Sequence, residues 1–310
     1  MGWLNGLFRR SKAQESPEPG RPNEVIPEAG GQKTAGQKMD GQEAGSVPDQ
    51  QEADLQEAMR KEPVLQVSNI QGVGTREHQE DSFAVRNWAD PRQQEQQGLL
   101  AIVADGMGGM AHGSQASQCT VDVLLERFQC RDEEIPIPNW LYAGAFEANE
   151  QVFRQFGGQS GTTLTAVHIQ NGRLYWLSVG DSAIYLMRDG GVYQLNREHT
   201  YLNRLYAREL EEETIDKSRA ESDVDARRLT SFVGIDHLQE VDVSLRPLNL
   251  KCGDAVLLCS DGISGVLTPP ELREAMALPP DEGCALLETM VLEKQIPAQD
   301  NYTGVMIAYR

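Results

Sequence analysis

The sequence is short of positive charge: 47 aspartate and glutamate residues outnumber 28 lysine and arginine residues, and the formal net charge is -19. Binding to the phosphate backbone of nucleic acids requires clustered basic side chains, so this balance argues against a nucleic-acid partner. The excess of acidic side chains is compatible instead with the binding of metal cations.

Long apolar runs are also missing. No stretch approaches the roughly 20 apolar residues of a membrane-spanning helix, and no secretory signal is visible, so we expect no transmembrane segment. The cysteines are few and show no Cys-x-x-Cys spacing of the kind that binds zinc. They are typical of reduced structural thiols, and a cytoplasmic location is expected.

Residues 1–62 lack the composition of a folded domain. From Ser11 onward this segment is rich in Gln, Glu, Pro, Gly, Lys and Ala, with almost no aromatic or β-branched residues. Such a segment cannot bury enough apolar surface to offset its chain entropy, so we predict a disordered tail followed by one domain over residues 63–310. The apolar tip at residues 3–8, with basic residues after it, is either a weak docking peptide or part of the disordered terminus.

Three apolar runs, each typical of a strand, lead into an aspartate beside a glycine. The runs and their aspartates are 99–104 with Asp105, 175–179 with Asp181 and 255–260 with Asp261. A single Asp-Gly pair is a common turn dipeptide and carries little information. Its recurrence at strand ends predicts carboxylates gathered at the mouth of a sheet.

The remaining pattern predicts strands and helices in separate groups. Helical apolar spacing covers 113–128, 139–156 and 283–293, and a further helix begins at Pro269. Four strands joined by tight turns between residues 162 and 195 predict an antiparallel meander, and strands follow at 241–245, 255–260 and 304–309. The charged segment 198–228, called the 198–228 insertion below, is interpreted as a helical or mobile insertion over one face. The fold class expected is α+β, a pair of sheets with helices packed outside.

Six short motifs occur in one order along the domain. They are Arg76-x-x-x-Glu80-Asp81, Asp105-Gly106-Met107-Gly108-Gly109, Gly161-Thr162-Thr163, Val179-Gly180-Asp181-Ser182, Ser260-Asp261-Gly262 and Asp300-Asn301-x-Thr303. Together they resemble the metal-dependent serine/threonine protein phosphatases, the type 2C or PPM family, in its bacterial branch. The resemblance covers residues 64–310 and implies a central antiparallel β-sandwich flanked by pairs of α-helices.

The resemblance also implies a chemistry. Two ions of Mg²⁺ or Mn²⁺ would activate a water for hydrolysis of phosphoserine or phosphothreonine in proteins, because such ions prefer carboxylate, carbonyl and water oxygens. Asp105 would bridge both ions, Gly106 would offer its carbonyl oxygen, and Asp261 and Asp300 would complete the ligands.

Other motif residues receive supporting roles from the same resemblance. Glu80 and Asp81 would hold metal-bound waters, and Arg76 would bind the substrate phosphate through its fork of donors. Asp181 is either a ligand of a weak third ion or a residue that only hydrogen-bonds its own turn. Gly265 stands where many members have a further aspartate that helps this third site, so any third ion should bind weakly.

Departures from the family pattern also matter. Gln79 replaces the usual Asn, and Met107 stands where animal members have a histidine proposed as a general acid. His78, His112 and His199 are therefore assigned surface or capping roles. We expect a monomeric phosphatase of phosphorylated proteins that opposes a bacterial Ser/Thr kinase. The competing hypotheses are a non-catalytic phosphoprotein-binding regulator on the same fold and a hydrolase of small phosphorylated metabolites.

Overall fold

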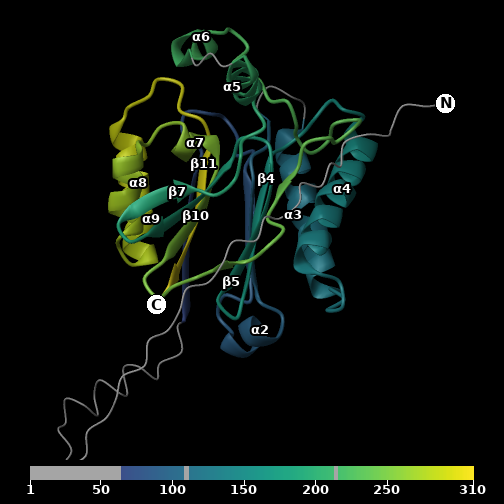
Figure 1. Ribbon diagram of the computed structural model, residues 1–310, viewed down its shortest axis with the longest axis vertical. Helices are drawn as coiled ribbons and strands as arrows, with labels where there is room; N and C mark the ends of the chain where they lie inside the picture. The colour runs from purple at the N-terminus through teal and green to yellow at the C-terminus, as the bar shows by residue number, and fades with distance from the viewer. Residues whose placement is uncertain (1–63, 108–111, 213–215) are drawn as a thin grey trace, which may run out of the picture. The chain divides into compact units, whose positions relative to one another are not determined.

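Two antiparallel sheets lie face to face in the computed structural model, which describes residues 64–107, 112–212 and 216–310 (Figure 1). The first sheet has the strand order β1 (Leu65–Gly72), β11 (Tyr302–Tyr309), β10 (Ala255–Cys259), β6 (Ala183–Arg188) and β7 (Gly191–Gln194). The second has the order β2 (Ser82–Arg86), β3 (Leu99–Ala104), β4 (Leu164–Gln170), β5 (Arg173–Val179) and β8 (Asp242–Val243), and β9 (Leu248–Asn249) also pairs with β5.

The position of strand β3 between two cores explains why its sequence is continuously apolar. Leu99, Ala101 and Val103 point into the core between the two sheets. Leu100 and Ile102 belong to a second core beneath the helices on the outer face. Because successive side chains of a strand point to opposite faces, a central strand covered on both faces needs an apolar residue at every position.

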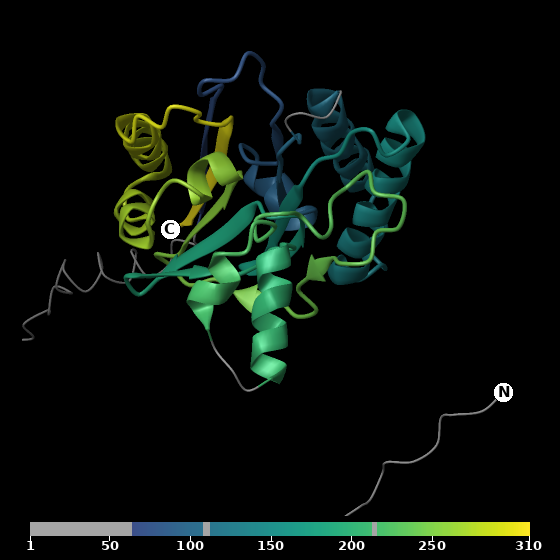
Figure 2. The same ribbon diagram turned by 90° about the horizontal axis from the view of Figure 1, so that it is seen from above.

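A pair of helices covers the outer face of each sheet. The helices α3 (Gly113–Gln129) and α4 (Ile137–Phe156) pack on the second sheet. The helices α8 (Pro269–Met276) and α9 (Pro280–Glu293) pack on the first. Figures 1 and 2 both show one pair on each side of the sheets. The predicted α+β sandwich with helices outside is therefore confirmed.

Shorter helices occupy the connections. The helix α2 (Pro91–Gln96) lies between β2 and β3, and α7 (Asp261–Ser264) begins two residues after the end of β10. The 198–228 insertion contains α5 (Tyr201–Glu211) and α6 (Lys217–Glu221). Figure 1 shows these two helices beyond the same edge of the sheets at which α7 lies.

The predicted meander is wrong in one respect: its four strands do not share a sheet. Strands β4 and β5 belong to the second sheet, whereas β6 and β7 belong to the first. The chain changes sheets at Gly180, whose φ of +100° is readily adopted only by glycine. A Cβ at Gly180 would also lie 2.8 Å from the Cγ2 atom of Thr163. This crossing places Asp181 at the boundary between the two sheets.

Two further expectations concern the ends of the domain. The tail predicted over residues 1–62, with its apolar tip at residues 3–8, lies outside the described residues and stays a prediction. In the part of the chain that the structure describes, no helix has the length and apolar character needed to cross a bilayer.

Candidate active site

Asp81 and Asp105 lie side by side at one edge of the second sheet. Asp81 directly precedes β2, and Asp105 directly follows β3. The two strands pair antiparallel with Ser82 opposite Ala104. The register therefore places the two carboxylates next to each other, as expected for residues that flank a paired strand end.

The first sheet contributes three aspartates at the corresponding edge. In this sheet β10 lies between β11 and β6. Asp261 stands two residues after β10, while Asp300 and Asp181 each stand two residues before β11 and β6, respectively. Because all three strands are antiparallel to their neighbours, the end of β10 meets the beginnings of β11 and β6.

Hydrogen bonds between the sheets join these two edges. The hydroxyl of Ser260 donates to Oδ2 of Asp81 at 2.9 Å. The hydroxyls of Thr163 and Ser182 lie 2.7 Å apart, within hydrogen-bond distance. The aspartates of both sheets thus surround one site, to which the structure brings every predicted site residue: Arg76, Glu80, Asp81, Asp105, Gly106, Asp181, Asp261 and Asp300.

The backbone of Asp105 is fixed independently of its side chain. Its N–H donates to Oγ1 of Thr163 at 3.0 Å. Its carbonyl oxygen accepts from the Thr162 hydroxyl and from the Thr163 N–H, both at 2.8 Å. The carboxylate is therefore left to point into the site while neighbouring threonines hold the chain.

Gly106 is required by a close approach of the backbone. A Cβ at this position would lie 2.3 Å from the carbonyl oxygen of Glu80 and 2.6 Å from that of Gly113. The N–H of Gly106 donates to the same Glu80 oxygen at 3.2 Å. A larger residue would push Asp105 away from Glu80 and from the beginning of α3.

The carboxylates raise one another's pKa because they are buried and carry like charge. Burial raises the pKa of Asp105 well above its usual range, and nearby carboxylates raise it further. Those carboxylates belong to Asp81, Asp261, Asp181 and Asp300. Burial is also the main reason why the pKa of Asp81 rises to about 6 and that of Asp181 to about 7. Burial, followed by the charge of Asp300, raises the pKa of Asp261.

This concentration of negative charge suits a hard divalent cation. Among the described side chains, Oδ1 of Asp81 is buried without a hydrogen-bond partner, although a buried carboxylate oxygen ordinarily has one. Within residues 64–107, 112–212 and 216–310, no three His, Cys, Asp or Glu side chains converge as a complete ligand set. Mg²⁺ commonly takes only one or two protein carboxylates and keeps water for its other positions, so the donor set fits this ion.

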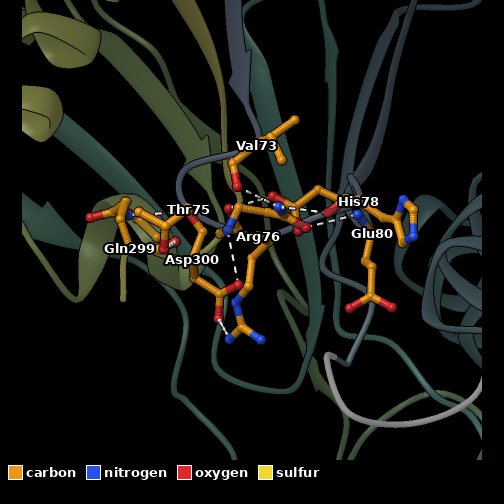
Figure 3. A network of polar contacts seen from close by, with 11 residues as sticks. Val73, Thr75, Arg76, His78, Glu80, Gln299 and Asp300 are labelled. Carbon is orange, nitrogen blue, oxygen red and sulfur yellow. Dashed lines mark hydrogen bonds and ion pairs between the residues drawn. The ribbon is translucent and has the colours of Figure 1, made fainter. Parts of the chain in front are cut away.

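Arg76 supplies positive charge at the edge of the site. Its Nη2 atom lies 2.7 Å from Oδ2 of Asp300, and the two side chains are 46% and 40% exposed. Figure 3 shows the side chains of Arg76 and Glu80 extending from their loop in the same direction, with Asp300 beside Arg76. An ion pair this exposed is weak, about 0 to 1 kcal/mol, so the guanidinium can exchange Asp300 for another anion.

The loop that carries Arg76 is tied to the segment before β11. The Thr75 N–H and hydroxyl donate to the Gln299 carbonyl oxygen at 2.9 and 3.0 Å. The amide of Asn301 donates to the carbonyl oxygens of Val73 and His78 at 2.8 and 3.1 Å. Asn301 also accepts from the Glu80 N–H at 2.8 Å, so it fixes both ends of the loop.

His199 has the capping role, one of the two roles predicted for it. It is buried rather than at the surface, with 3% of its area exposed. Its ring atom Nδ1 accepts from the Gly180 N–H at 3.0 Å, and its backbone N–H donates to the Gly180 carbonyl oxygen at 2.8 Å. It thereby joins the start of the 198–228 insertion to the turn that carries Asp181. His78 and His112 are exposed, as predicted.

Sequence reasoning missed an arginine that lies near the site. Arg227 is exposed on the 198–228 insertion and lies close enough to Asp261 for its charge to lower the pKa of that carboxyl, against the larger effect of burial. No motif surrounds Arg227, and only the path of the insertion brings it to the site.

Comparison with known proteins places the chain in a family. The family model described as Protein phosphatase 2C matches residues 74–290. The serine/threonine protein phosphatase PstP of Mycobacterium tuberculosis is 33% identical over 189 residues, which cover 58% of this chain and 34% of that protein. This chain thus spans about a third of the length of that relative. The serine/threonine phosphatase stp of Listeria monocytogenes is 28% identical over 65% of this chain and 78% of its own.

Solved structures agree with this assignment. The crystal structure of the Mycobacterium tuberculosis phosphatase PstP/Ppp has a TM-score of 0.64 and 29% identity, covering 79% of this chain and 98% of that one. The PstP catalytic domain in complex with two manganese ions has a TM-score of 0.62 and 27% identity, covering 80% and 99%. A Streptococcus agalactiae serine/threonine phosphatase, 22% identical with a TM-score of 0.67 over 79% and 100%, shares the fold. The chain therefore belongs to the protein phosphatase 2C family.

Proposed function

We propose that this chain is a metal-dependent phosphatase that hydrolyses phosphoserine and phosphothreonine in proteins. The observation that carries the proposal is the group of buried carboxylates around Asp105, with the exposed guanidinium of Arg76 beside it. The names of the relatives support the protein substrate, and the manganese-bound PstP structure supports the metal.

The carboxylates divide into two groups by position. Asp105, Asp261, Asp300 and the carbonyl oxygen of Gly106 would hold two ions of Mg²⁺ or Mn²⁺. Such a pair of ions supplies an activated water and neutralises charge on the phosphate oxygens. Asp181 would contribute to any weaker third site.

Asp81 and Glu80 would orient water at the site. One oxygen of Asp81 accepts from Ser260, and the other is free to accept from water. Glu80 lies beside Gly113 at the beginning of α3, with its backbone fixed by Asn301. Both carboxylates are therefore placed to hold ordered water.

Arg76 would bind the substrate phosphate. Its guanidinium can donate two parallel hydrogen bonds to a phosphate, which bind more strongly than bonds between neutral groups. Such a phosphatase reverses the reaction of a protein serine/threonine kinase, and we propose a kinase of this kind as its counterpart. The monomeric state and the cytoplasmic location stay predictions.

Phosphate release from defined substrates tests the proposal. The purified full chain is assayed with p-nitrophenyl phosphate, a phosphothreonine peptide and small phosphorylated metabolites, each with Mn²⁺. We expect hydrolysis of both the peptide and p-nitrophenyl phosphate. Peptide binding without phosphate release would favour the non-catalytic regulator, and release from metabolites alone would favour the small-molecule hydrolase.

The substitution Arg76→Ala should weaken catalysis through the phosphate. We expect a fall in kcat/KM that corresponds to a loss of about 1.5 to 3 kcal/mol of transition-state stabilisation, the range for hydrogen bonds to a charged group. Mn²⁺ affinity, measured by calorimetry, should hold or rise, because the variant removes a positive charge next to Asp300. Arg76→Lys should recover part of the loss, since it keeps the charge but loses the fork. A large loss of Mn²⁺ binding would instead give Arg76 a structural role.

The metal-free protein should lose stability as pH rises from about 5 to 7.5. The pKa values of Asp81 and Asp181, about 6 and about 7, lie above the ordinary value of 3.8. At these carboxyls the folded state binds more protons than the unfolded state. This effect outweighs the opposite one at buried His168, whose pKa falls to about 4, so the free energy of unfolding falls with increasing pH. Thermal unfolding in EDTA across this range measures the slope, and Asp181→Asn should reduce it. A stability that rises across the same range would contradict the prediction.

A further inference from the structure

A cavity of about 720 Å³ lies between the candidate site and the 198–228 insertion. Its apolar lining comes from Met107, Tyr201, Leu229, Phe232 and Ile235. The volume falls within the roughly 300 to 1,000 Å³ of ligand pockets, which are mostly apolar with a few polar groups. The reaction proposed above does not use this cavity.

The cavity adjoins the carboxylates through two short connections. Met107 stands two residues after Asp105, and its N–H donates to the Gly161 carbonyl oxygen at 3.1 Å. Phe232 lies against Gly161, where a Cβ would be only 2.6 Å from the Cδ2 atom of the phenylalanine ring. A polypeptide whose phosphorylated residue reaches Asp105 would therefore place a neighbouring side chain at the cavity.

Two arginines line the cavity, although the whole chain has a net charge of -19. Arg204 and Arg228 line it together with Asp225. Arg204 is paired with Glu240, its Nη2 atom 3.1 Å from Oε2. Arg228 is exposed, and none of the ion pairs found among the described residues includes it. An acidic group on a bound segment would thus meet a complementary charge at Arg228.

We infer that this cavity is a substrate subsite, which receives a large apolar side chain close to the phosphorylated residue in a segment that also carries acidic side chains. The inference rests on the proposed phosphatase function and adds a substrate preference to it. The apolar lining selects the large side chain, and Arg228 selects the acidic neighbour.

Pairs of phosphothreonine peptides test the preference in the unmodified protein. Within each pair, phenylalanine replaces serine at one of the four positions on either side of phosphothreonine. At one or more positions we expect kcat/KM to be about tenfold higher or more for the phenylalanine peptide, as for burial of an apolar group in a fitted pocket. Ratios near one at every position would overturn the inference.

The same assays separate this inference from the proposed function. If p-nitrophenyl phosphate and all peptides resist hydrolysis with Mn²⁺, the phosphatase function itself fails. If all are hydrolysed without preference, only the subsite fails.

Two variants locate the preference in the cavity. Tyr201→Ala removes part of the apolar lining but keeps the backbone bond from residue 201 to the Arg228 carbonyl, which is 2.8 Å long. It should lower the phenylalanine to serine ratio at least threefold, whereas Tyr193→Ala, at an exposed tyrosine of β7, should not. Because the ratio is taken within one variant, a change in folded fraction cancels. An unchanged ratio in Tyr201→Ala would place the preference elsewhere and overturn the assignment.

The acidic preference has its own pair of variants. Paired peptides carry either glutamate or glutamine next to the apolar residue, on the side away from phosphothreonine. We expect kcat/KM to be two- to fivefold higher for the glutamate peptide, about the size of an exposed ion pair. Arg228→Ala should abolish this preference. The matched control Arg208→Ala, at an exposed arginine of α5, should retain it. Equal loss in both variants would assign the effect to general charge and overturn the role of Arg228.

Discussion

Replacing Asp105 by asparagine is expected to lower kcat by at least about a thousandfold with every phosphorylated substrate. Four other carboxylates lie close enough to Asp105 for their charge to raise its pKa. Asparagine keeps the size of the side chain but removes the charge that would be shared by two cations. The rate of hydrolysis of p-nitrophenyl phosphate at saturating Mn²⁺ measures the effect.

The same variant should not unfold the protein. The hydrogen bonds that hold residue 105 use its backbone, with Thr162 and Thr163 as partners. Removing one of several crowded like charges should raise the unfolding temperature in EDTA at pH 8. Thr163→Ala offers a contrasting control, because it loses a backbone anchor and should lower that temperature. A rate within a few-fold of the unmodified protein would show that Asp105 is not central to the reaction.

Most of the architecture could be predicted because it depends on local sequence patterns. The continuous apolar run of β3 and the helical spacing of α3 and α4 reflect which faces of these elements are buried. The helix α8 begins where Pro269 follows Thr268, with Glu271 completing a capping box. Each of these signals depends only on residues within one or two turns of the chain.

The crossing at Gly180 could not be predicted in the same way. The alternation of side chains along β5 and β6 is the same whichever sheet these strands join. Which sheet they join depends on their partners, β4 for β5 and β10 for β6. The helix α2 was missed for a different reason: it buries none of its residues, so no apolar period marks it. Its signals are only the side chain of Asp90, which caps its N-terminus, and the proline that follows.

In the candidate site, too, some residues could be predicted from local patterns and others could not. Short motifs identified Asp105, Asp261 and Asp300, since each stands at a strand end within a recognisable pattern. His199 and Arg227 lie in a segment without such a pattern. Their proximity to the site depends on the path of the insertion, and the apolar cavity beside Met107 is formed by that path as well.

Removing divalent metal should abolish the activity. In excess EDTA we expect the rate on a phosphothreonine peptide to fall at least about a thousandfold, because uncompensated carboxylates repel a phosphate dianion and leave water unactivated. Adding Mn²⁺ or Mg²⁺ back in excess over EDTA should restore the rate. Arg76 alone cannot replace the ions, since its single positive charge is outnumbered by the carboxylates around Asp105. Full activity in EDTA would refute the metal-dependent mechanism.

The number of Mn²⁺ ions that bind to each chain can also be predicted. Calorimetric titration with Mn²⁺ should show two tightly bound ions per chain, and any third should bind only at about millimolar concentration, the weak end for carboxylate sites. The third site would share Asp261 with the main pair and has Gly265 where another carboxylate would help. Asp181→Ala should remove the weak binding and spare the tight pair. Gly265→Asp is a less clean test, because its Cβ would lie 2.8 Å from the Asp261 carbonyl oxygen and the end of α7 would have to shift. Tight binding of three ions to the unmodified protein would contradict the prediction.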